Sequence, residues 1–92
     1  MNELYVEKTG NVVSISGNTE WKNAGIMEVE LFTLPEGCRP NYRGRSFVSH
    51  ISTGGGPNGG FCIFTIETSG KCILKYMSCD GYPIIDSTFV CA

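Results

Sequence analysis

Length, composition and charge describe a small globular domain. The chain has 92 residues with a formal net charge of −2, and 17% of them are charged. No block of lysines and arginines is present, which excludes a nucleic-acid-tracking surface, and the apolar runs are too short to span a membrane. We expect a single domain over residues 1–92 without a secretory signal, because the N-terminus has no apolar segment.

Short strands separated by turn residues are predicted in the first third of the chain. Leu4–Lys8 and Asn11–Ser16 are the first two, and Ile26–Phe32 is the third. The third strand alternates two sets of side chains, which are Met27, Val29 and Leu31 against Ile26, Glu28, Glu30 and Phe32. Because the first set is purely apolar, it should face the core, with both glutamates outward.

The stretch LPEGCRP, residues 34–40, is predicted to be a rigid corner. Pro35 cannot donate to a sheet ladder, and Pro40 biases the preceding residue toward extended geometry. Gly37 supplies the torsional freedom that a bend needs. The corner therefore indicates architecture rather than an active site, with Cys38 as a small filler.

A hairpin dominates the second half. After a predicted strand at Ser46–Ile51 and a glycine-rich loop over 52–60, the strands 61–66 and 71–77 flank a turn that ends at Gly70. One apolar surface should join two sets of side chains, namely Cys62, Phe64 and Ile66 with Cys72, Leu74 and Tyr76. A last run over 82–91 completes six to eight strands, which predict an all-β fold, a small antiparallel β-sandwich.

The five cysteines lie at positions 38, 62, 72, 79 and 91. An odd number cannot all pair within one chain, and none of the spacings is a CxxC pair. With His50 as the single histidine, the sequence gives little support to zinc. Free core thiols made in a reducing compartment are favoured, and a disulfide framework stays as the alternative.

Three motifs, in this order, resemble a known family. They are Gly10-Asn11-Val12-Val13, the corner at 34–40 and the hairpin Phe64–Leu74. Together they cover most of residues 10–76 and are similar to the small, jelly-roll-like head domains at the C-terminal ends of tailed-phage receptor-binding, baseplate and tail-fibre proteins. The family usually has Tyr or Phe where Cys38 stands, and aliphatic residues at the positions of Cys62 and Cys72.

The resemblance implies a homotrimer that attaches a virion to a saccharide on the host bacterial surface. Other tail or baseplate proteins are the implied neighbours, and the implied location is the phage tail of the virion, after synthesis in the host cytoplasm. Some relatives only trimerise or cap a fibre, and this structural role is the alternative. A small core also makes oligomerisation a natural source of added stability.

The acidic residues do not predict an enzyme. Nine aspartates and glutamates are scattered along the chain, and only Glu28 and Glu30 share a strand face, about 6.5–7 Å apart by strand rise. That spacing suits a glycosidase, but it also suits an ordinary exposed strand. No feature places a cysteine beside His50 as a thiol–imidazole pair. We expect no catalytic residue, no metal and no cofactor.

Saccharides are bound by aromatic faces together with planar polar side chains. Trp21 lies in a polar stretch, and Tyr82 follows Asp80-Gly81, so Trp21, Asp80 and Tyr82 are candidate ligand-binding residues. The alternatives are a core anchor for Trp21 and a turn-closing role for Tyr82.

Three basic or titratable residues complete the candidate set. His50 lies on a predicted strand, where it lines a groove or subunit contact, or is buried with a partner. Arg43 and Arg45, close to Arg39, fit either a bidentate phosphate site or a solvated surface loop.

Overall fold

Seven antiparallel strands make up the fold. The computed structural model describes residues 3–41, 43–52 and 57–91. The strands are β1 (Glu3–Thr9), β2 (Val12–Asn18), β3 (Gly25–Thr33), β4 (Arg45–Ser52), β5 (Pro57–Ile66), β6 (Lys71–Met77) and β7 (Tyr82–Val90). The all-β prediction is confirmed. The described part of the chain contains no helix long and apolar enough to cross a bilayer.

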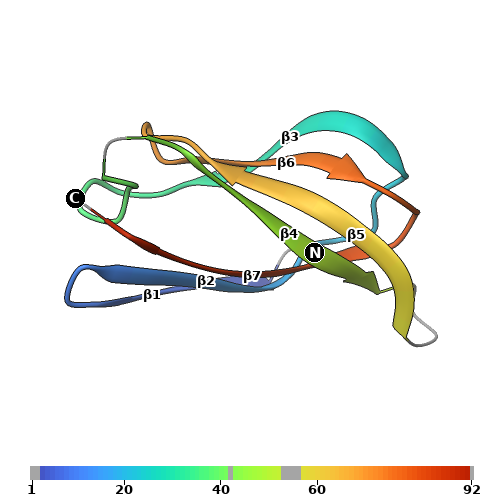
Figure 1. Cartoon of the computed structure of the whole chain (residues 1–92), viewed down its shortest axis with the longest axis horizontal. Helices are drawn as coiled ribbons and strands as arrows, with labels where there is room; N and C mark the ends of the chain where they lie inside the picture. Colours follow the sequence, from blue (N-terminus) through green and yellow to red (C-terminus); the bar gives the residue numbers. More distant parts are fainter. Residues whose placement is uncertain (1–2, 42, 53–56, 92) are drawn as a thin grey trace.

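The strands follow the order β1-β2-β7-β4-β5-β6-β3 and curl into a half-barrel. Figure 1 shows two layers, with β1, β2 and β7 below and β3 to β6 above. Between the layers, β4 pairs with β7 only at Ile51–Pro83 and Ser52–Tyr82. The predicted sandwich is therefore a single sheet, folded over where β4 meets β7.

The core lies between the layers, because apolar side chains alternate along the strands. On β7, for example, Ile85 and Phe89 are buried, whereas the residue that follows each of them is exposed. The core consists of Val13, Ile15, Leu34, Ile51, Cys62, Phe64, Ile66, Cys72, Leu74, Met77, Ile85, Phe89 and Cys91. As predicted, Met27, Val29 and Leu31 pack against it, although each remains partly exposed.

All five cysteines are free, as the favoured prediction states. Burial raises the pKa of the Cys62 thiol to about 11 and that of Cys72 to about 12. Both thiols therefore stay protonated at neutral pH, and neither is a nucleophile or a metal ligand there. They act as small apolar residues in the core.

The hairpin face was predicted wrongly at one residue. The pairing of β5 with β6 shifts between Ile63 and Phe64, so Met77 lies opposite Cys62. Tyr76 instead lies opposite Ile63, on the outer face. A bulge inserts one extra residue and thereby reverses the alternation beyond it, which a reading of strict alternation cannot anticipate.

Irregular pairing also explains a second error, at Phe32. The register of β3 against β6 shifts between Glu30 and Phe32. As a result, Leu31 and Phe32 both pack against the core, whereas strict alternation placed Phe32 outward.

The glycine-rich loop is shorter than predicted. Pro57 pairs with Ser52 and begins β5, so the last four residues of the predicted loop over 52–60 belong to a strand. A proline is tolerated at the first position of a strand, where no ladder donor is required. Residues 53–56 of the predicted loop lie outside the described residues.

The corner at 34–40 is structural, as predicted. The Cys38 amide donates to the Pro35 carbonyl at 3.1 Å, and Gly37, with φ of 90°, takes the left-handed conformation that this turn requires. The Leu34 amide donates to the Gly70 carbonyl at 2.8 Å, and Pro40 forms a bridge with Cys91. The corner thus ties the hairpin turn and the chain's last strand together at one end of the molecule, beside the C-terminus in Figure 1.

Replacing Gly70 tests this tie. Gly70 has φ of +93°, and an added Cβ would lie 2.6 Å from the Leu34 carbonyl oxygen and 2.8 Å from Arg39 Nε. We expect Gly70→Ala to lower the free energy of unfolding in urea by about 3 kcal/mol, from backbone strain plus overpacking. The matched control is Gly10→Ala, with φ of +62° and open space around its Cβ, which should cost about 1 kcal/mol. Equal losses in the two variants would contradict the tie.

Candidate functional site

Trp21 and Tyr82 form an exposed aromatic pair. The segment after β2 pairs with the start of β7, because the Lys22 amide donates to the Gly81 carbonyl at 2.8 Å and the Gly81 amide donates back at 3.0 Å. This pairing places the two rings edge to face, with their centroids 5.3 Å apart. Trp21 is 46% exposed and Tyr82 is 41% exposed. Trp21 is therefore not a core anchor.

Polar groups surround the aromatic pair. Lys22 Nζ lies 3.3 Å from a Glu20 carboxylate oxygen, and this hydrogen bond and charge hold the pKa of Glu20 below its usual value. Asp80 has a different role, since its Oδ1 accepts a hydrogen bond from the Ala24 amide at 2.6 Å. Asp80 therefore closes the connection between β2 and β3, and positions the loop that carries Trp21.

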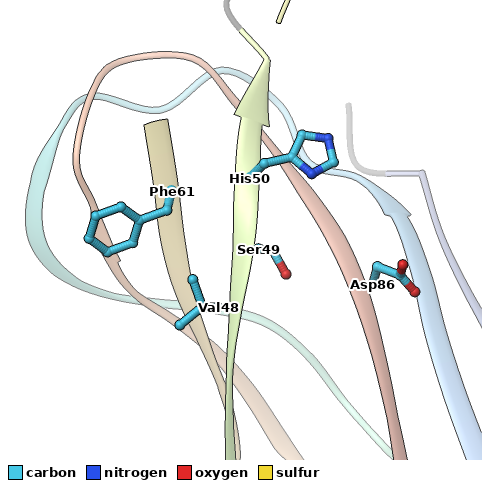
Figure 2. A pocket seen from close by; sticks show the side chains of 5 residues that line it. All are labelled: Val48, Ser49, His50, Phe61 and Asp86. Atoms are coloured by element: carbon cyan, nitrogen blue, oxygen red, sulfur yellow. The ribbon is translucent and has the colours of Figure 1, made fainter. Parts of the chain in front are cut away.

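A shallow groove lies on the outer surface beside β4. It is lined by Val48, Ser49, His50, Phe61 and Asp86, and its volume is about 370 Å³. Figure 2 shows His50 and Ser49 projecting from β4 toward the side where Asp86 lies, with Phe61 on the other side of β4. The volume is at the lower end of the range for small-ligand sites, roughly 300–1,000 Å³. His50 is thus exposed and lines a groove, one of its predicted roles.

The groove lies on the same outer surface as Tyr82. Tyr82 lies opposite Ser52, and His50 is two residues before Ser52, about 7 Å along the strand. Tyr82 and His50 are both exposed side chains on this outer surface. Four of the predicted site residues, Trp21, His50, Asp80 and Tyr82, therefore lie at one end of the sheet.

Arg43 and Arg45 lie at the other end. Arg45 begins β4 and Ser52 ends it, which separates them by about 23 Å of strand. Arg45 Nη1 donates to the carbonyl of Arg43 at 2.9 Å, and Arg39 Nε donates to that of Leu34 at 3.0 Å. Arg39 and Arg45 therefore help to hold the backbone in and after the corner. None of the three arginines joins the aromatic pair.

Of the five groove residues, only His50 was a candidate from the sequence. Asp86 and Phe61 lie on predicted strands, and the alternation along those strands predicts that both side chains are exposed. The sequence carries no signal that β7 would lie beside β4, because the two strands are distant along the chain and pair at only two positions. The groove follows from this non-local contact.

The groups considered for catalysis lie apart or are otherwise engaged. Lys75 binds Glu28, and this hydrogen bond holds the pKa of Glu28 below its usual value, whereas a general acid needs a raised pKa. Cys62 is buried in the core while its neighbour Phe61, opposite His50, is exposed. The Cys62 thiol and the imidazole therefore lie on opposite faces of the sheet. Within the described ranges, no three His, Cys, Asp or Glu side chains are grouped to hold a metal ion.

The outer face of the upper layer also carries an apolar row. Cross-strand pairing aligns Val48 with Ile63, Ile63 with Tyr76, and Tyr76 with Ile26. Ile26 is 91% exposed and Val48 is 71% exposed. Phe61 extends this apolar row, with its ring centroid 5.6 Å from that of Tyr76. A contiguous exposed apolar surface of this kind is typical of a protein contact.

Comparison with known proteins gives no assignment. No protein-family model matches this chain, and no curated protein matches it.

Trp21 is the single tryptophan, so its fluorescence reports on the loop that Asp80 closes. We expect Asp80→Ala to shift the emission to longer wavelength and to increase iodide quenching, because the loop loses its bond to the Ala24 amide. The free energy of unfolding should fall by about 1 kcal/mol. Asp86→Ala removes the same group from an exposed position of β7 and should leave the emission unchanged. An unaltered spectrum in Asp80→Ala would show that the carboxylate does not position Trp21.

Proposed function

We propose that this chain is a non-enzymatic head domain of a phage tail or baseplate, which attaches the virion to a saccharide on the host bacterial surface. The motifs at 10–13, 34–40 and 64–74 support the family. The observation that carries the binding function is the exposed Trp21–Tyr82 pair. In this proposal the protein is made in the host cytoplasm and resides in the virion.

The pair has the chemistry that sugars require. Aromatic rings pack against the C–H faces of a pyranose, and neighbouring charged groups take its hydroxyls. Glu20 and Lys22 are both within the segment that presents Trp21, and the Glu20 carboxylate is ionised. A half-exposed tryptophan costs apolar hydration in the free protein, and a sugar covering it would recover that cost.

The structural alternative is a trimerisation or capping module without a small ligand. The apolar row favours it, because Ile26 and Val48 expose large aliphatic side chains on a flat sheet face. The two roles are compatible, and we propose that the head is a homotrimer whose subunits meet through the Ile26, Tyr76 and Ile63 part of this row, which leaves Val48 and Phe61 exposed in the groove. In a cyclic trimer the row would contact a different surface of the next copy. The exposed Val12 and Val90, paired on the outer face of the lower layer, are suitable.

Binding to a glycan array and to intact bacterial cells tests the first role. We expect Trp21→Ala to lower the affinity at least about tenfold, because a central aromatic contact is typically worth ~1.4 kcal/mol or more. Tyr5→Ala is the matched control, since it removes an exposed aromatic from β1, the edge strand of the sheet. Undiminished binding by Trp21→Ala would refute the site. If the unaltered protein bound neither glycans nor cells, the structural role would be the remaining proposal.

Light scattering tests the homotrimer. We expect a mass three times that of the 10.0 kDa chain and expect Ile26→Glu to shift it toward the monomer at micromolar concentration, because a buried unpaired charge opposes the contact. Thr68→Glu places the same charge in the exposed hairpin turn and should leave the mass unchanged. A monomer in the unaltered protein would contradict the assembly.

A further inference from the structure

We propose that the groove lined by Val48, Ser49, His50, Phe61 and Asp86 is a second saccharide subsite. It lies on the same outer face as Tyr82, so a ligand that covers both is an oligosaccharide of at least two units rather than a single sugar. The inference rests on the proposed function, because it extends the same site along the sheet.

The two parts lie near each other on one face of the sheet. Tyr82 is opposite Ser52, and His50 is two residues before Ser52, about 7 Å along β4. Both side chains are exposed on the outer surface. A glycan chain that extends from Tyr82 along β4 would therefore reach the groove.

The lining of the groove has the composition of a sugar site. Phe61 offers a ring for C–H contacts, and Asp86 and His50 offer planar groups on the opposite side of β4. A carboxylate accepts hydrogen bonds from two hydroxyls, and an imidazole both donates and accepts. This combination of one aromatic face with two planar polar groups selects the orientation of a sugar ring.

Ser49 provides an independent observation. Its side chain is 7% exposed, and its hydroxyl has no hydrogen-bond partner among the described residues. In Figure 2 the hydroxyl points from β4 toward the side of Asp86. A buried hydroxyl without a partner is costly, and a ligand hydroxyl that enters the groove would supply one.

The charges of the groove define the class of sugar. Asp86 carries the one carboxylate among the five lining residues, and no lysine or arginine lines the groove. Arg43 and Arg45 lie at the other end of β4. The subsite therefore fits neutral or amino sugars, and disfavours sugars that carry phosphate or carboxylate groups.

The test uses an array of glucose, galactose, rhamnose and N-acetylglucosamine homo-oligomers of one to six units. We expect affinity to rise at least tenfold from the monomer to the trimer of the preferred sugar. His50→Ala and Asp86→Asn should each abolish most of this rise and leave the affinity for the monomer unchanged. Trp21→Ala should weaken binding at every length.

Two further variants serve as controls. Glu36→Gln removes an exposed carboxylate in the corner, at the other end of the molecule, and should bind like the unaltered protein. Ser49→Ala should raise the midpoint of thermal unfolding, because it removes the unpartnered hydroxyl, and should still lower the affinity for the trimer. A role in folding alone would not produce these opposite effects.

The outcomes separate the two proposals. Equal affinity for all lengths, or trimer binding that is unaffected by His50→Ala and Asp86→Asn, overturns the second subsite alone. Binding that also persists in Trp21→Ala overturns the aromatic site. If no saccharide on the array binds, the proposed function and the second subsite both fail.

Discussion

Two residue pairs between β4 and β7 hold the fold in its present shape. Ile51–Pro83 and Ser52–Tyr82 are the pairs that join the two layers. Because Ile51 and Pro83 are buried, this join also closes one end of the core. Beyond it the strands diverge, and a continuous sheet becomes two layers with apolar side chains between them. A longer ladder would keep the strands side by side and leave the apolar face of the sheet exposed.

The same separation creates the groove. Val48, Ser49 and His50 come from β4, just before the join, and Asp86 comes from β7, just after it. Backbone pairing ends there, and side chains of mixed chemistry take its place. Ser49 and Ser87, one on each diverging strand, are the buried residues whose hydroxyls have no partner in the described parts of the chain. Buried hydroxyls without hydrogen-bond partners are expected at functional sites, where other contacts of the fold offset their cost.

The sequence predicts what depends on neighbouring residues. Alternation identified the strands and most of the core, and the glycines of the corner and the hairpin turn take the left-handed conformations that their positions required. It failed at Tyr76 and Phe32, where bulges reverse the alternation. A bulge is set by packing against the partner strand, so the strand that contains it carries little sign of it.

The candidate site was predictable only as separate residues. Trp21 and Tyr82 each stood out as aromatics in polar surroundings, but their contact depends on hydrogen bonds between the Lys22 and Gly81 backbones. Backbone pairing between distant segments leaves no mark on side-chain identity. For Asp86 the sequence offered only exposure, since its place in the groove depends on the position of β4. Arg43 and Arg45 were grouped with the site by composition, and the length of β4 separates them from it.

The corner and the candidate site lie at opposite ends of the molecule, which limits what the family resemblance says about binding. The corner lies at the end where Pro40 bridges to Cys91, and a backbone hydrogen bond from Leu34 ties it to Gly70. The residues of the aromatic pair and of the groove lie outside all three motifs, at 10–13, 34–40 and 64–74. The motifs therefore describe the scaffold, and under the proposed function the choice of ligand would depend on residues outside them. Under the proposed function, specificity for a sugar would have to be derived from Trp21, Tyr82 and the groove, and not from the corner.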